Sequence, residues 1–360
     1  MPTPSLNWLL IFVPITAVLA YIVHPADWVL FVSAAFAIVP IAAMIGQATE
    51  NLSVQTGPTV GGLLNATFGN ATELIIAFFA LRAGKIEVVK ASITGSMISN
   101  MLLVLGLALF LGGLRYQKQT FNKEIAGALS SLLVIVMIAF LVPAMFDLTE
   151  RFGGVAPGNA LIGDAHFALA ASAVLIALYV GNLIFSLVTH KDLISISDEP
   201  HEGPTWPVKR SLGTLAVATV AVAWLSEILV GSLEGFSRQL GLTEVFAGLI
   251  IIPIVGNAAE HAASVFALKN KMDLSIQIAL GATIQIALLV APVLVIASFL
   301  MGQPMDLVIH RPLELVGLIG AALITASVAR DGETNWLEGA MLLGVYLLLA
   351  LAFFFLPVGA

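Results

Sequence analysis

The chain consists mostly of apolar stretches about 20 residues long, separated by short connections that hold charged residues, glycine and proline. A stretch of this length crosses the hydrocarbon core of a bilayer as a helix, because a helix pairs its own backbone polar groups. Charged residues make up 10% of the 360 residues, whereas soluble domains hold about 25%. We therefore predict an all-α, polytopic membrane protein with about eleven spans: 6–23, 28–50, 58–81, 86–112, 124–146, 160–188, 211–235, 244–268, 273–301, 312–329 and 336–357.

Composition excludes several classes of protein. The chain has no cysteine, which removes disulfides, thiolate metal sites and thiol catalysis. The net charge is −7 and no basic stripe is present, so nucleic acid is not an expected partner. No basic residue precedes the first apolar stretch, Leu6–Val23, and no small-residue cleavage site follows it. We expect this stretch to be a retained helix and not a signal peptide.

Several segments occur twice in the same order. GNATELIIAFFAL (69–81) is similar to GNAAEHAASVFAL (256–268), and GSMISNMLLV (95–104) is similar to GATIQIALLV (281–290). The spans from the second to the sixth thus repeat as the seventh to the eleventh. Because each unit has an odd number of spans, the second unit enters the membrane from the opposite side, as in many secondary transporters. The predicted organisation is an orphan helix and connection (1–27), a first repeat (28–188), a linker (189–210) and a second repeat (211–360).

The arrangement of basic residues predicts the orientation. Lys and Arg are more frequent on the side that holds the 113–123 and 189–210 connections, which places the N-terminus in the cytoplasm. The 189–210 linker carries four acidic residues, and it is either a solvated connection or a segment that attracts cations to a cytoplasmic opening. The lack of a long N-terminal extension favours a prokaryotic inner (plasma) membrane.

Each copy of the repeated motif places an asparagine and a glutamate in the middle of a span. Asn70 and Glu73 are three residues apart, as are Asn257 and Glu260, so each pair shares one helix face. A glycine precedes each asparagine and allows the helix to kink or break there. Backbone carbonyls freed at mid-membrane by such a break can bind a cation.

An ionised carboxylate at mid-membrane costs a few kcal/mol, and two close together cost more. No Lys or Arg lies within either motif, so the glutamates must bind protons or a metal cation. Carboxylate, amide and hydroxyl oxygens are hard ligands, which favour Ca²⁺. When the site is empty, its two negative charges make the change between the two open states of the carrier too costly. The carrier therefore changes state only with Ca²⁺ or protons bound, and it exchanges one for the other. We therefore predict a Ca²⁺/H⁺ antiporter that works by alternating access, with no catalytic residues and no cofactor.

Other polar residues are candidates for this site. His261 follows Glu260, with Leu74 at the equivalent position of the first copy, and it either takes part in proton coupling or bonds to a neighbouring helix. Asn70 and Asn257 are expected metal ligands beside Glu73 and Glu260, with interhelical packing as the alternative. The expected supporting polar core is Ser99, Asn100, Thr283 and Gln285. Glu50 and Glu227 are the expected vestibule residues near opposite faces, with a packing role as the alternative.

The motif pair resembles the paired motif of the cation/proton exchanger family of Ca²⁺/H⁺ antiporters. The resemblance rests on GGLLNATFGNATELIIAFFAL (61–81) and IIIPIVGNAAEHAASVFAL (250–268), with supporting segments at 96–106, 284–292 and 185–190. It implies an eleven-helix fold with an orphan first helix, in which Glu73 and Glu260 are the essential exchange carboxylates. It also implies a homotrimer. The 189–210 linker has fewer acids than the acidic helix of that family, so regulation through it is doubtful.

Three alternatives compete with this interpretation. A Na⁺/Ca²⁺ exchanger is a related branch whose repeats typically carry proline before the acid, where this chain has Thr72 and Ala259. An intramembrane zinc protease would need HExxH, and only Glu260-His261 is present, in the reverse order. A passive channel would not need two titratable acids. Selectivity between Ca²⁺ and other divalent cations stays open.

Overall fold

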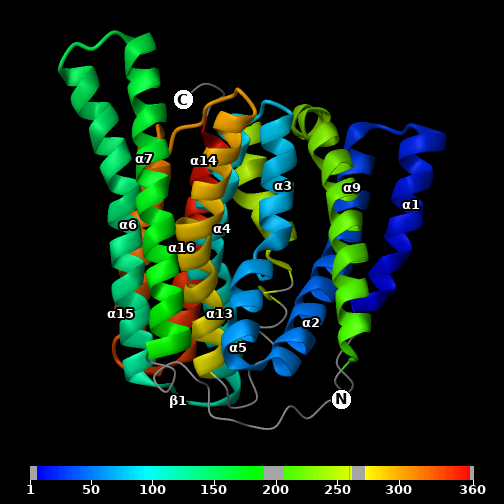
Figure 1. Cartoon of the computed structure of the whole chain (residues 1–360), viewed down its shortest axis with the longest axis vertical. Coiled ribbons are helices and arrows are strands. Elements are labelled where there is room, and N and C mark those ends of the chain that lie inside the picture. The colour runs from blue at the N-terminus through cyan, green and yellow to red at the C-terminus, as the bar shows by residue number, and fades with distance from the viewer. Residues whose placement is uncertain (1–5, 190–205, 259, 262–271, 357–360) are drawn as a thin grey trace. The chain divides into compact units, whose positions relative to one another are not determined.

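The structure is a computed structural model, and it describes residues 6–189, 206–258, 260–261 and 272–356. These residues are almost all helical (Figure 1). They divide into two compact units: residues 1–92 with 199–259, and residues 93–198 with 260–360. Most of the 189–210 linker, part of the 244–268 span and the basic residues Lys269 and Lys271 lie outside the described residues.

Unit 1 is built around two long helices, α2 (Asp27–Phe68) and α9 (Val208–Leu240), which pack along each other. The first expected span consists of three short segments, η1 (Leu6–Ile11), α1 (Phe12–Val18) and η2 (Leu19–Val23), and the first two pack on α2. The other elements are α3 (Ala71–Arg82), the first part of α4 (Ile86–Ile98), α10 (Glu244–Phe246), η5 (Ala247–Ile251) and α11 (Ile252–Gly256).

A glycine reverses the chain within α2. The connection expected at 51–57 is wrong in its extent, because the helix continues to Thr56 and only Gly57 leaves the helical conformation, with φ at +82°. The Ser53 hydroxyl donates to the Gly61 carbonyl at 2.7 Å, so the two arms lie directly against each other. Positive φ is a conformation that glycine adopts without a steric penalty. Gly57 alone therefore separates the two spans that the sequence analysis ended at residue 50 and began again at residue 58.

Unit 2 holds the rest of α4 and the remaining elements. These are η3 (Ser99–Val104), α5 (Leu105–Arg115), α6 (Lys123–Phe152), α7 (Pro157–Ile184), η4 (Phe185–Thr189), α13 (Met272–Gln285), η6 (Ile286–Val290), α14 (Ala291–Leu300), α15 (Pro312–Ala329) and α16 (Trp336–Phe355). Helix α5 packs closely on α16 because Gly113 and Gly339 have no side chains. A Cβ at either position would collide with the backbone of the other helix. Helices α6 and α7 are antiparallel neighbours joined by residues 153–156 (Figure 1).

Connections that should share one face of the membrane do meet in unit 2. The strands β1 (Gln119–Thr120) and β2 (Glu333–Thr334) pair antiparallel, with Gln119 opposite Thr334. The backbone N–H of Asn122 also donates to Asp273 at 2.5 Å, at the start of α13. These segments follow the fourth and tenth expected spans and precede the ninth. Regular crossing of a membrane brings all three to one face, so their contacts agree with the expected order of spans.

Eight helices among the described residues are long and apolar enough to cross a membrane. Their limits are Asp27–Gly57, Ile86–Arg115, Lys123–Phe152, Gly158–Thr189, Val208–Leu240, Met272–Leu300, Pro312–Ala329 and Trp336–Phe355. Two shorter apolar helical segments cover Asn7–Val23 and Glu244–Gly256. Helix thus occurs along each expected span, although several are interrupted, and the count of eleven stays a prediction. The two units each take spans from both predicted repeats, and the inverted repeat also stays a prediction.

Candidate functional site

Both repeated motifs interrupt their helices. In the first motif (GNATE, 69–73), α2 ends at Phe68 and α3 begins at Ala71, with Asn70 at φ −100° and ψ 23°. In the second motif (GNAAE, 256–260), α11 ends at Gly256, and Asn257 has nearly the same conformation, φ −87° and ψ 14°. The sequence analysis expected the chain to kink or break at these glycines. The predicted breaks are present.

The break places Glu73 in the first turn of α3, where its carboxyl is buried with 6% exposure. Unpaired N–H groups and the helix dipole give the start of a helix a partial positive charge, which stabilises an anion. Asn70 immediately precedes this turn and is 2% exposed. The local fold therefore offers a carboxylate and an amide at one buried helix end without any Lys or Arg beside them in the sequence.

Glu73 of the first motif lies against Gly256 of the second motif, within unit 1. A Cβ at position 256 would be 3.3 Å from Glu73 Cγ and 3.7 Å from both Cδ and Oε1. Helices α3 and α11 pack together at this point. The amide nitrogen of Asn257 donates to the Pro253 carbonyl at 2.9 Å, so its oxygen is the atom that could bind a cation. The break in one motif thus brings backbone and an amide of the second motif close to the carboxyl of the first.

In unit 2, the second motif continues with Glu260 and His261, which are both half-buried and helical. His261 Nε2 lies 3.4 Å from the hydroxyl of Ser99, which is fully buried. Asn100 is also fully buried, and neither of its amide atoms has a hydrogen-bond partner among the described residues. The structure therefore joins His261 to one member of the expected polar core, Ser99.

Two π-helical turns occur at matching positions of the repeated segments. Ser99 is the first residue of η3, and Gln285 directly precedes η6. Such turns occur frequently at functional sites because they interrupt the regular backbone bonding. The Thr283 hydroxyl donates to the Ala279 carbonyl of its own helix at 2.9 Å. Thr283 is thus buried beside η6, and its hydroxyl proton is engaged in a hydrogen bond within its own helix.

A family model described as "Sodium/calcium exchanger protein" matches residues 26–188 and 210–355. The chain belongs to this family. It is 48% identical to the Ca²⁺/H⁺ antiporter of Aphanothece halophytica, over 97% of this chain and 96% of that protein. It is 44% identical to the Ca²⁺/H⁺ antiporter ChaA of Bacillus subtilis, over 94% and 96%. The crystal structure of the selenium-substituted Ca²⁺/H⁺ antiporter protein YfkE is 40% identical and covers 98% of this chain and 100% of that one, with a TM-score of 0.83.

These similarities confirm two predictions. The all-α, polytopic membrane fold is shared with solved exchanger structures along nearly the whole chain. The resemblance to the cation/proton exchanger family is confirmed by the relatives, which extend well beyond the two motifs.

The sequence analysis missed one buried tyrosine of this chain that lies near the expected polar core. Tyr346 of α16 is 4% exposed, and its hydroxyl lies near Ser99 without a hydrogen bond of ordinary geometry. Ser99 is therefore adjacent to both His261 and Tyr346. The only sequence signal was one hydroxyl in an otherwise apolar span, and nothing in the spacing indicated which helix it would meet.

The charged residues near the span ends pair with each other. Arg82 Nη1 lies 4.0 Å from Glu227 Oε1, and both side chains are more than 60% exposed, so the pair is weak. Lys85 Nζ lies 2.8 Å from Glu244. Glu50 is exposed on α2. These contacts are compatible with the vestibule role predicted for Glu50 and Glu227, which stays a prediction.

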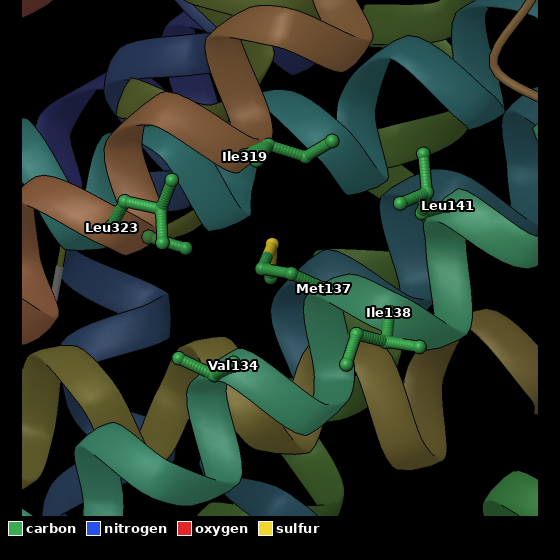
Figure 2. A pocket seen from close by; sticks show the side chains of 7 residues that line it. Val134, Met137, Ile138, Leu141, Ile319 and Leu323 are labelled. Carbon is green, nitrogen blue, oxygen red and sulfur yellow. The ribbon is translucent and has the colours of Figure 1, made fainter.

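An apolar pocket between α6 and α15 is a different feature (Figure 2). It is lined by Val134, Met137, Ile138, Leu141, Ile319 and Leu323, so it offers no ligand to a cation. In the part of the chain that the structure describes, no three His, Asp or Glu side chains are placed to hold one metal ion.

Proposed function

We propose that the chain is a secondary active antiporter that exchanges Ca²⁺ for H⁺ across a membrane by alternating access. Glu73 and Glu260 bind either the cation or protons, and Asn70 and Asn257 supply further oxygens. The observation that carries the proposal is the contact of Glu73 with Gly256, because it joins the two motifs at one buried place. Relatives named Ca²⁺/H⁺ antiporters support the substrate pair.

The physical basis of coupling is the charge of the empty site. Two carboxylates bring a charge of −2, which one Ca²⁺ or two protons would cancel. The start of α3 stabilises Glu73 as an anion while it is loaded with a cation. An empty, doubly charged site in a medium of low polarity is costly, so the carrier crosses between its two open states only when loaded.

The polar residues of unit 2 support the exchange in this proposal. His261, Ser99, Asn100 and Gln285 provide hydrogen-bonding groups beside Glu260, and Thr283 helps to keep the neighbouring turn in place. Glu50 and Glu227 attract cations at the two openings. The bacterial relatives favour the plasma membrane of a prokaryote, where the exchanger uses the proton gradient to export cytosolic Ca²⁺, with the N-terminus in the cytoplasm. A homotrimer remains the expected assembly.

Reconstitution in liposomes tests the function directly. Purified protein should drive Ca²⁺ uptake when the liposome lumen is acidic, and uptake should stop when the proton gradient is dissipated. An imposed Na⁺ gradient without a pH gradient should give no uptake, since the rival is a Na⁺/Ca²⁺ exchanger. Uptake that follows Na⁺ and ignores the pH gradient would refute the proposal. If uptake needs neither the pH gradient nor the Na⁺ gradient and only runs down the Ca²⁺ concentration gradient, the protein is a channel.

Glu73→Gln and Glu260→Gln test the site. Glutamine has nearly the shape of a protonated glutamate but cannot release a proton, so each variant should lose exchange and remain folded. Glu124→Gln is the matched control, because Glu124 is exposed at the start of α6 and should exchange normally. Normal exchange by both motif variants would show that the site is elsewhere. Separately, competition of Mn²⁺, Cd²⁺ and Mg²⁺ with Ca²⁺ uptake by the wild type would measure the cation selectivity.

A further inference from the structure

A second group of buried acids lies in unit 2, at the end where α6 leads into α7. Asp147 is one turn before the end of α6, and Asp164 is two turns after the start of α7. The exposed fractions are 7% for Asp147 and 1% for Asp164. The two helices pack along each other, so both carboxyls are enclosed at the same helix pair. None of these residues belongs to the repeated motifs.

The two carboxyls have different surroundings. Arg151 Nε donates to both oxygens of Asp147, at 2.7 and 2.8 Å, one helical turn away. This charge-assisted contact engages both oxygens of Asp147 as acceptors. Neither oxygen of Asp164 accepts a hydrogen bond from a donor group among the described residues, and the polar group within reach is the carboxyl of Asp147. Two buried carboxylates side by side cannot both be ionised without strong repulsion.

The other charged groups around Asp164 do not relieve this repulsion. Asp306 and Glu150 act on it with further negative charge. Asp306 accepts a hydrogen bond from the Val308 backbone at 2.7 Å, and His310 lies 3.9 Å from it. Among the described residues, Arg151 is a cation that acts on Asp164, and its hydrogen bonds go to Asp147. One negative charge among the buried pair therefore remains without compensation.

A proton is the ligand that fits this pair. Arg151 already supplies one positive charge to the pair, so only one further positive charge is needed. A single proton removes the uncompensated charge and supplies the missing hydrogen-bond donor between the two carboxyls. We propose that Asp147 and Asp164 form a proton-binding pair, in which protonated Asp164 donates to the carboxylate of Asp147 and so holds the ends of α6 and α7 together. This site is separate from the proposed exchange site and does not depend on it.

Infrared difference spectroscopy on the full-length protein in detergent tests the proton directly. At neutral pH and saturating Ca²⁺, which displaces protons from Glu73 and Glu260 if these bind the cation, the wild type should retain a carboxylic-acid C=O band that disappears at alkaline pH. Asp164→Asn should lack this band. Asp147→Asn should lack it as well, because Arg151 would then pair with Asp164 and ionise it. Glu124→Gln, on the same helix as Asp147, should keep the band.

Thermal unfolding supplies a second readout. Loss of the proton at alkaline pH leaves two facing carboxylates, so the melting temperature of the wild type should fall by several degrees from neutral to alkaline pH. Asp164→Asn keeps a neutral group of the same shape and should show a clearly smaller fall. If Asp164→Asn does not fold, Asp147→Asn and the wild-type spectra still decide the question. Three results would overturn the proposal. The wild type could lack the band at neutral pH, the band could persist in Asp164→Asn, or Ca²⁺ could abolish the band by binding to Asp147 and Asp164 in place of the proton.

Discussion

The side chain of Glu73 lies directly against Gly256, with Cγ 3.3 Å from the place where a Cβ would stand. The two residues are far apart in the sequence and belong to different copies of the repeated motif. Ordinary carbon contacts are about 3.5–4.0 Å, so glycine is what allows this approach. The contact predicts that the second motif shapes the surroundings of the first carboxyl.

Gly256→Ala should weaken Ca²⁺ binding and leave the protein folded. The added methyl group would push the Glu73 carboxyl away from its position, and a loss of about 1.4 kcal/mol corresponds to a tenfold weaker affinity. The half-saturating Ca²⁺ concentration for exchange in liposomes measures the effect. Gly231→Ala is the control, since Gly231 lies on α9 with open space around it. Equal effects of the two substitutions would contradict the prediction.

Ser99→Ala should reduce the rate of exchange several-fold. The variant removes the hydroxyl that contacts His261, and one lost hydrogen bond costs about 1 kcal/mol. Initial rates of proton-driven Ca²⁺ uptake provide the measurement. Ser130→Ala is the matched substitution, because the Ser130 hydroxyl is buried but bonds only to the carbonyl of Ala126 on its own helix. Unchanged rates in Ser99→Ala would show that this serine has only a packing role.

Gly57→Ala should destabilise unit 1. Alanine at φ +82° adopts a left-handed conformation that costs about 1 kcal/mol or more, and the reversal of α2 depends on that conformation. The melting temperature in detergent should fall relative to the wild type. Gly46→Ala, on the same helix with open space around it and no positive φ, should be neutral or slightly stabilising. If both variants melt like the wild type, the reversal does not need glycine.

Thr94→Val should lower the stability of unit 2. The Thr94 hydroxyl donates to the carboxyl of Glu314, which is 3% exposed, and valine would leave that oxygen without this donor. A buried polar atom that loses its partner costs about 1–3 kcal/mol. Thr219→Val, which removes only a bond to the carbonyl of Leu215 on the same helix, should have a smaller effect on melting. A larger loss in Thr219→Val would refute the role of the Thr94–Glu314 contact.

The sequence predicts the helical segments and both motif breaks, because apolar length and mid-span glycine act locally. It does not predict the Gly57 reversal, since the polar residues of 51–56 read as a loop although they continue the helix. The same limit explains the missed partners. Tyr346 and Asp164 are isolated from the repeated motifs, and their partners depend on which helix packs beside them.

The π-turn η3 has a consequence for how the fourth expected span could have evolved. A π-turn holds one residue more than an α-helical turn, so it rotates all following side chains by roughly 100° relative to the preceding ones. Ser99 lies at its start, and Gly113, which gives α16 its close approach, lies after it. Deleting one residue within Ser99–Val104 would restore a regular helix and turn that glycine away from α16. The serine and the glycine can therefore face their respective partners only because the span carries this one additional residue.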